Sequence, residues 1–198
     1  MAIGHTLLVL SPWRNPIPLR RSWCLWEILC TIEAGAAAQF SVQLSADEEA
    51  DFIAAVAGSW QSAQEALTAV DVREAEAWQA TDRAAIAAAV EAGVGFEETN
   101  VAVTAKLREW LAATATAAVG RLRAADDRDW IDLASSVGVM LMDMSRLGEA
   151  EPLLVDAQRP ARRHTGQRGQ PRAPAARPRQ AGGGRAAVAR DAAGEVRP

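Results

Sequence analysis

The sequence predicts an α/β unit with a partial parallel sheet at the start of the chain, an all-α region after it, and a disordered C-terminal tail. Three observations carry this fold class. The first 45 residues show the order strand, helix, strand. From Ser45 onward apolar residues recur at helical spacing, and after residue 158 Ile, Leu, Met, Phe and Trp disappear. At 198 residues the chain is long enough for one domain and a piece of a second.

Residues 1–45 are predicted to form the strand–helix–strand unit. HTLLVL (5–10) is a β-branched and leucine run that stops at a Ser-Pro pair, as a buried strand does. Ser22 is placed to cap the following helix, which ends at Gly35. QFSVQL (39–44) alternates apolar and polar residues and predicts a second strand, parallel to the first. Two parallel strands need neighbours, so we expect further strands before the first residue, and self-association or aggregation of the chain as written.

Residues 46–120 are predicted to be a helical extension of that unit. The sequence S-A-D-E, starting at Ser45, is a capping box that opens the first helix. Apolar spacing then predicts helices near 60–70, 81–93 and 98–119, the last one ending before a glycine.

The tail, residues 159–198, differs in charge from the rest of the chain. It carries 10 Arg against 2 acidic residues, whereas residues 1–158 carry 11 Lys and Arg against 23 acidic residues, net charges of +8 and −12. A segment with so few apolar side chains cannot offset the entropy of ordering, so we predict disorder. A basic tail can bind RNA or an acidic partner by releasing counterions. This one lacks aromatic residues and RGG repeats, so we do not expect a nucleic-acid partner.

The densest stretch, residues 10–30, holds three of the seven tryptophans and both cysteines. On a helix Cys24 and Cys30 point to different faces and cannot bridge each other. No CxxC pair or nearby histidine accompanies them, so we predict reduced thiols and no metal site.

The start of the chain lacks the basic flank of a signal peptide, and no apolar run approaches a membrane span. We therefore expect a cytoplasmic chain without a membrane partner.

The helix in this stretch has a structural interpretation. Trp23, Trp26, Glu27 and Cys30 share one face, and leucines and isoleucines occupy much of the remainder. This composition predicts a helix buried on nearly all sides, and burial alone explains its tryptophans. Glu27 is then a solvated carboxylate, or one paired with an arginine that precedes the helix.

The same stretch follows a known pattern, in which a strand leads through Ser-Pro into a helix that begins S-x-W-C-L-x-E. Its residues here are Ser11, Pro12, Ser22, Trp23, Cys24, Leu25 and Glu27, and Trp13 and Trp26 belong to the longer string around them. The pattern resembles the second half of a TIR-like domain. Over 3–119 the chain also resembles a domain that precedes kinesin-light-chain-type tetratricopeptide repeat (TPR) arrays in large proteins of unicellular algae. In TIR domains that cleave NAD the glutamate of this motif is catalytic, so the resemblance implies that role for Glu27. A carboxylate there can stabilise the positive charge that builds on the ribose as nicotinamide leaves.

Residues 128–158 are predicted to form two helices joined by a turn at 145–148. They follow the pattern LA..L...G...EAEPL...AL, with Leu133, Ala134, Leu141, Gly148, Glu149, Ala150, Glu151, Pro152, Leu153 and Ala157. This segment resembles one TPR of the kinesin-light-chain type. Each such repeat exposes an apolar face that the next repeat covers, so about three or more are needed for stability. Small residues, Gly138 among them, lie where the two helices would cross closely.

The repeat resemblance also bears on the tail. Read one nucleotide later, GGRAAV (183–188) permits Glu-Ala-Glu-Pro-Leu-Leu, which falls one TPR period after EAEPLL at 149–154. Our hypothesis is that the sequence from about residue 160 onward is a frameshift product. An in-frame cDNA through this region would contradict it.

Two main functions follow from these interpretations. The favoured one is a scaffold that binds a protein or peptide through a TPR-type surface, needs no cofactor and is catalytically inactive as written. The alternative is an NAD+ glycohydrolase, or a degenerate relative of one, that uses Glu27. One glutamate is not a site, however, and the other nucleotide-binding elements of that family precede this region.

Overall fold

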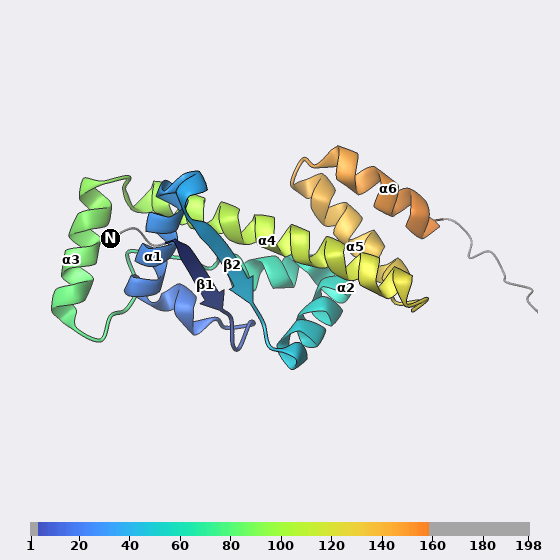
Figure 1. The fold of residues 1–198 in the computed structure, drawn as a ribbon, viewed down its shortest axis with the longest axis horizontal. Helices are drawn as coiled ribbons and strands as arrows, with labels where there is room; N and C mark the ends of the chain where they lie inside the picture. The colour runs from blue at the N-terminus through green and yellow to red at the C-terminus, as the bar shows by residue number, and fades with distance from the viewer. Residues whose placement is uncertain (1–3, 159–198) are drawn as a thin grey trace, which may run out of the picture. The chain divides into compact units, whose positions relative to one another are not determined.

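The computed structural model describes residues 4–158, which form two strands, six α-helices and two short 3-10 helices (Figure 1). In chain order the elements are β1 (His5–Val9), η1 (Ile17–Arg20), α1 (Ser22–Glu33), η2 (Gly35–Ala37), β2 (Gln39–Gln43), α2 (Ala46–Thr68), α3 (Ala80–Ala92), α4 (Phe96–Ala124), α5 (Trp130–Asp143) and α6 (Leu147–Gln158). The chain is mostly helical with a small parallel sheet, which confirms the predicted order of an α/β unit and then helices. The predicted disordered tail, 159–198, lies outside the described residues.

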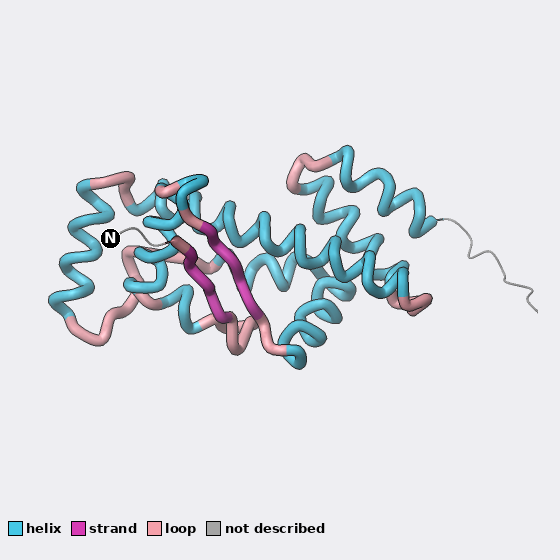
Figure 2. The backbone as a smooth tube through the Cα atoms, viewed as in Figure 1, coloured by secondary structure: helices cyan, strands magenta, loops and turns pink. Residues whose placement is uncertain are grey.

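The sheet consists of β1 and β2 side by side and parallel (Figure 2). In its register Leu8 lies opposite Val42. Side chains alternate between its two faces. On the inner face Leu8 is 5% exposed, and the hydroxyls of Thr6 and Thr31 share a 2.6 Å hydrogen bond that joins β1 to α1. On the outer face Leu7 and Val9 are 51% and 53% exposed. Helix α1 therefore covers one face of the sheet and leaves the other open to solvent.

Helix α1 departs from prediction at its start. Its N-cap is Arg21, and the Ser22 hydroxyl instead donates a 2.9 Å hydrogen bond to the carbonyl of Ala75. The backbone N–H of Ser22 also donates to the Glu76 carbonyl at 2.8 Å, and Arg21 forms a parallel bridge with Glu76. The predicted Ser22 cap is wrong because this long-range contact uses the hydroxyl.

The prediction that α1 is buried on nearly all sides is also wrong. Leu25 and Ile28 are fully buried, but Trp23 is 49% exposed and Glu27 is exposed. Trp23 and Glu27 lie on the outer face of α1, Trp26 is half-buried and packs against the core, and the aliphatic face lies within the core.

Helix α2 begins as predicted, with the Ser45 hydroxyl accepting a hydrogen bond from the N–H of Glu48 at 3.3 Å. The Glu48 carboxylate accepts hydrogen bonds from the Trp13 N–H at 3.0 Å and the Ser11 hydroxyl at 3.4 Å.

Further along α2, Ser59 has non-helical angles (φ −162°, ψ 100°), so the helix is kinked directly after Gly58. A glycine–serine pair is a common cause of such a kink. The two helices predicted here are the two arms of α2.

The main core lies where α2, α4 and α5 pack against one another. Phe52 of α2 contacts Trp13 and Trp110, with ring centroids 5.1 and 5.3 Å apart. Helices α1 and α3 pack on α4. Helix α4 runs past Gly120 to Ala124, five residues beyond its predicted end. Among residues 4–158, no helix combines the length and apolar character that a membrane span requires.

Helices α5 and α6 form the predicted helix pair, joined by a turn in which Ser145 has φ 60°. A β-carbon added to Gly138 of α5 would lie 2.6 Å from two side-chain atoms of Leu154 on α6. Glycine is needed here because the two helices approach closely, which is the role that the sequence predicts for its small residues.

Candidate functional site

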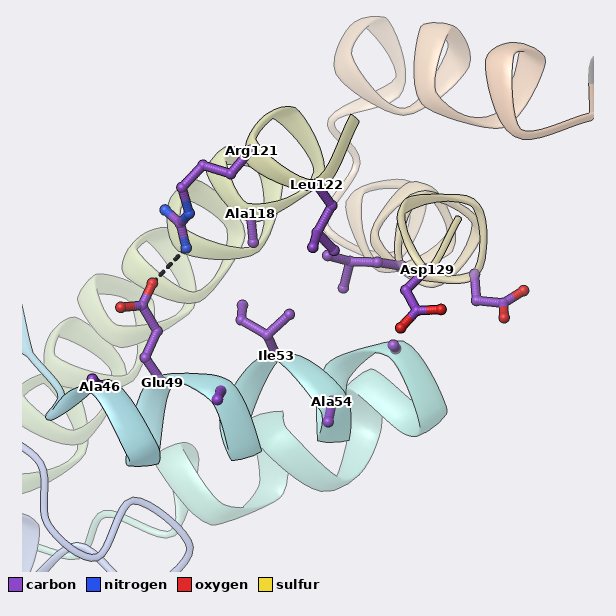
Figure 3. A pocket seen from close by; sticks show the side chains of 12 residues that line it. Ala46, Glu49, Ile53, Ala54, Ala118, Arg121, Leu122 and Asp129 are labelled. Carbon is purple, nitrogen blue, oxygen red and sulfur yellow. Dashed lines mark hydrogen bonds and ion pairs between the residues drawn. The ribbon is translucent and has the colours of Figure 1, made fainter. Parts of the chain in front are cut away.

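An open groove lies between the first arm of α2, the end of α4 and the start of α5 (Figure 3). Its volume is about 700 Å³, which is within the usual range of ligand sites. Its lining residues are Ala46, Glu49, Ala50, Ile53, Ala54 and Ala57 from α2, Ala118, Arg121 and Leu122 from α4, and Asp129, Asp132 and Leu133 at the start of α5. The walls are mostly apolar, and the charged groups belong to three different helices.

The sequence of α2 explains the empty space. Ala46, Ala50, Ala54 and Ala57 recur at intervals of three and four residues, which places them on one side of the helix. Each contributes only a methyl group, so this side does not fill the gap to α4 and α5. Ile53 also lines the groove, but the largest residues of α2, such as Phe52 and Trp60, lie on its core side and are buried. The groove therefore results from an alanine face on a helix that is packed through its other face.

One charged pair crosses the groove. The Arg121 guanidinium of α4 donates to the Glu49 carboxylate of α2, as the dashed line in Figure 3 shows. Both side chains are substantially exposed, so solvent screens the pair and its contribution to stability is small. The pair joins two walls of the groove.

Two further carboxylates, Asp129 and Asp132, lie at the start of α5 and line the groove. The side chain of Asp129 points from α5 toward α2 (Figure 3). Asp129 is the N-cap of α5, yet its carboxylate caps no backbone N–H. Within residues 4–158 neither carboxylate has an ion pair or a side-chain hydrogen bond. Three carboxylates and one guanidinium thus line the groove, which gives it a net negative charge.

Glu27 does not line this groove. It is exposed on the outer face of α1, and among the described residues it makes no ion pair with Arg20 or Arg21.

The two cysteines of α1 have raised pKa values. Burial raises the pKa of the Cys24 thiol, and the charge of Glu27 raises it further. Burial likewise raises the pKa of Cys30. Both thiols are therefore held in their protonated, unreactive form at neutral pH.

The other residues of the S-P and S-x-W-C-L-x-E pattern hold the loop and α1 in place. Trp13 is 1% exposed, and its indole N–H donates to Asp51 of α2 at 2.8 Å. The Arg14 guanidinium lies 4.5 Å from the Trp13 ring and forms an ion pair with Asp51 at 2.9 Å. Trp23 donates its indole N–H to Asp82 at the start of α3, at 3.1 Å. Local sequence patterns do not reveal Asp51 and Asp82 as partners, because these residues lie 38 and 59 positions away in the chain.

The TPR-like residues pack α5 and α6 together and onto the body of the chain. Leu133, Ala134, Leu141 and Ala150 are buried, Leu153 and Ala157 are half-buried, and Gly148 and Pro152 are exposed. Leu133 also lines the groove. The groove itself was not predicted, although the alanine spacing in α2 and the acidic connector AADDRD before α5 were its signals.

Within residues 4–158, no group of three or more His, Cys, Asp or Glu side chains could hold a metal ion. Comparison of this chain with protein-family models, with curated proteins and with solved structures finds no match. The geometry, walls and charges of the groove are therefore the basis for its proposed function.

Proposed function

We propose that this chain is a protein–protein interaction module that binds an apolar helical segment of a partner protein in the α2–α4–α5 groove. The observation that carries the proposal is an open groove of about 700 Å³ with apolar walls from three helices. Grooves between helices commonly bind an amphipathic helix through apolar residues one turn apart.

The small side chains of one wall suit such a partner. Ala46, Ala50 and Ala54 are exposed, and each lets a partner backbone come close to α2. Ile53 and Leu122, both half-buried, supply the larger apolar contacts. Burying two or three leucine side chains of a partner would contribute about 1.5–3 kcal/mol each. The cost of association offsets much of this gain, so we expect a weak complex with a dissociation constant of about 0.1 mM or higher.

The α5–α6 pair supports the same class of function. Its resemblance to one TPR implies a repeat that packs against another helix pair. Val139 and Met142 of α5 are 48% and 50% exposed, and Leu147 of α6 is 62% exposed. Apolar side chains on both helices are thus available to a protein neighbour.

The test uses the whole chain and a defined probe. The probe is a labelled synthetic helix of about 18 residues, five turns, with a leucine stripe and otherwise Ala and Gln, so that it carries no charge. Fluorescence anisotropy measures its affinity for the chain and for the variant Ala54→Trp, which fills the groove with an indole. We expect Ala54→Trp to weaken binding by at least about tenfold.

The matched control is Ala88→Trp, since Ala88 is an exposed alanine of α3 outside the groove. It should bind the probe like the unsubstituted chain, and both variants should keep the original melting temperature. Equal affinity of the chain and of Ala54→Trp for the probe, or no binding by either, would contradict the proposal.

A further inference from the structure

We infer that the partner of the groove is a basic amphipathic helix, whose Lys or Arg side chains flank the apolar stripe and contact Asp129 and Asp132. This inference rests on the proposed function and names the chemistry of the partner. It follows from two carboxylates at the groove that their own helix does not use.

The Asp129 carboxylate is not used by its own helix. An aspartate at an N-cap ordinarily accepts a hydrogen bond from a backbone N–H of the first turn. At the start of α5, carbonyl groups already accept from the N–H groups of Trp130, Ile131 and Leu133. The carboxylate of Asp129 makes no capping bond and is directed toward α2 (Figure 3). An acidic residue near a helix N-terminus is favoured by the helix dipole, but the dipole leaves the carboxylate oxygens free for a cation.

The groove has more acidic than basic side chains. Its only lining cation among the described residues, Arg121, is paired with Glu49. Arg123 lies over the Trp130 ring at 5.2 Å and pairs with Asp156 of α6. Over residues 4–158 the acidic side chains outnumber the basic ones by 23 to 11. A basic partner is therefore favoured both at the groove and by the field of the whole described part.

The two carboxylates also have a spacing that a partner helix can match. Asp129 and Asp132 are three residues apart, so they lie about one turn from each other on the same side of α5. Two cations three or four residues apart on a partner helix have the matching spacing. With its leucine stripe against Ile53 and Leu122, such a helix can place these cations beside the two carboxylates. The apolar walls give affinity, and the carboxylates select the charge and the orientation of the partner.

The experiment compares three labelled peptides that share one leucine stripe and differ only beside it, where they carry pairs of Lys, Gln or Glu. We expect the Lys peptide to bind the full chain about three- to tenfold more tightly than the Gln peptide, and the Glu peptide to bind more weakly still. Raising the salt from about 0.05 M to about 0.5 M should reduce this preference, because the contacts are exposed to solvent.

The variant Asp129→Asn/Asp132→Asn should lose the preference for Lys and keep its affinity for the Gln peptide. The control Glu33→Gln/Glu91→Gln changes the net charge equally at exposed sites on α1 and α3, and it should keep the preference. If the Gln peptide binds in the groove but the Lys peptide binds no better, this inference is overturned and the proposed function stands. If Asp129→Asn/Asp132→Asn retains the Lys preference, the inference is likewise overturned. If no peptide binds, the proposed function itself fails.

Discussion

Asp51 shows how one side chain holds a loop that the local sequence leaves free. Its carboxylate accepts hydrogen bonds from the Trp13 indole at 2.8 Å and from two nitrogens of Arg14 at 2.9 and 3.0 Å. Hydrogen bonding to Arg14, and then to Trp13, lowers the pKa of Asp51 below its usual value. The folded state therefore prefers the ionised carboxylate. The stability that Asp51 adds is fully present above its unfolded pKa of about 3.9 and is lost as the pH falls through the lower folded pKa.

We predict that Asp51→Asn lowers the urea midpoint of unfolding at pH 7, because an amide cannot replace the ionised partner of Arg14. The difference in urea midpoint between this variant and the unsubstituted chain should become smaller once the pH falls below about 4, since protonation then removes the same charge from Asp51. Tryptophan fluorescence in urea from pH 7 down to pH 3 measures both midpoints. Glu91→Gln, at an exposed site on α3, should show no such gap. A gap for Asp51→Asn that stays constant over this range would contradict the assigned role of its charge.

Single residues also show where sequence patterns stop being informative. Ser22 precedes an apolar helix, as an N-cap does, but its hydroxyl bonds to Ala75, which is 53 residues away. Glu48 occupies the capping-box position, yet its carboxylate holds Ser11 and Trp13. A local pattern cannot identify a distant partner. Asp129 and Asp132 are visible in the sequence as acids before a helix, but only the fold places them at a groove.

Helices and strands were predicted more completely than single contacts. Their apolar periodicity is a local property, so both strands, the start of α2, and helices α3, α5 and α6 follow it. The kink at Ser59 and the continuation of α4 through Gly120 were not predicted. Gly58 and Gly120 both have open space beside them, so the glycine alone does not decide whether a helix continues. The groove was not predicted either, although the alanine spacing of α2 is visible in the sequence, because the groove is the space left when the other face of α2 packs.

The contact between α5 and α6 gives a prediction about Gly138. Alanine in a helix interior is favoured over glycine by about 1 kcal/mol. Here the added methyl group would meet Leu154 at 2.6 Å, and overpacking of this kind costs about 1–3 kcal/mol. We therefore expect Gly138→Ala to lower the free energy of unfolding by about 1 kcal/mol, and to raise it in a Leu154→Ala background. Urea unfolding of the four proteins in this cycle measures the coupling.

Gly120 provides the matched control for that cycle. It lies within α4 with nothing within 4 Å of the position of an added β-carbon. Gly120→Ala should raise the free energy of unfolding by up to about 1 kcal/mol. Additive effects of Gly138→Ala and Leu154→Ala, within about 0.5 kcal/mol, would show that the close approach of the two helices carries no strain cost.

At the scale of the whole described part, residues 4–158, the sheet presents two different faces. The inner face packs on α1, and the outer face exposes Leu7 and Val9 beside a row of polar β2 residues. Each strand also has one edge that no other described strand pairs with. An open strand edge next to exposed apolar side chains is a surface through which chains associate. The sequence predicts self-association on the same ground, since two parallel strands need neighbours.

We predict that Leu7→Lys/Val9→Thr reduces self-association of the chain and leaves its folding intact. Both side chains are about half exposed, so little burial is lost, and a lysine on an edge strand opposes pairing with another strand. Sedimentation velocity over a range of concentrations measures association, and urea unfolding measures stability. Leu8→Ala, on the inner face of the same strand, is the control and should cost about 2–5 kcal/mol because Leu8 is buried. If Leu7→Lys/Val9→Thr associates as strongly as the unsubstituted chain, the contact lies elsewhere. The exposed apolar side chains of α5 and α6 are then the next surface to alter.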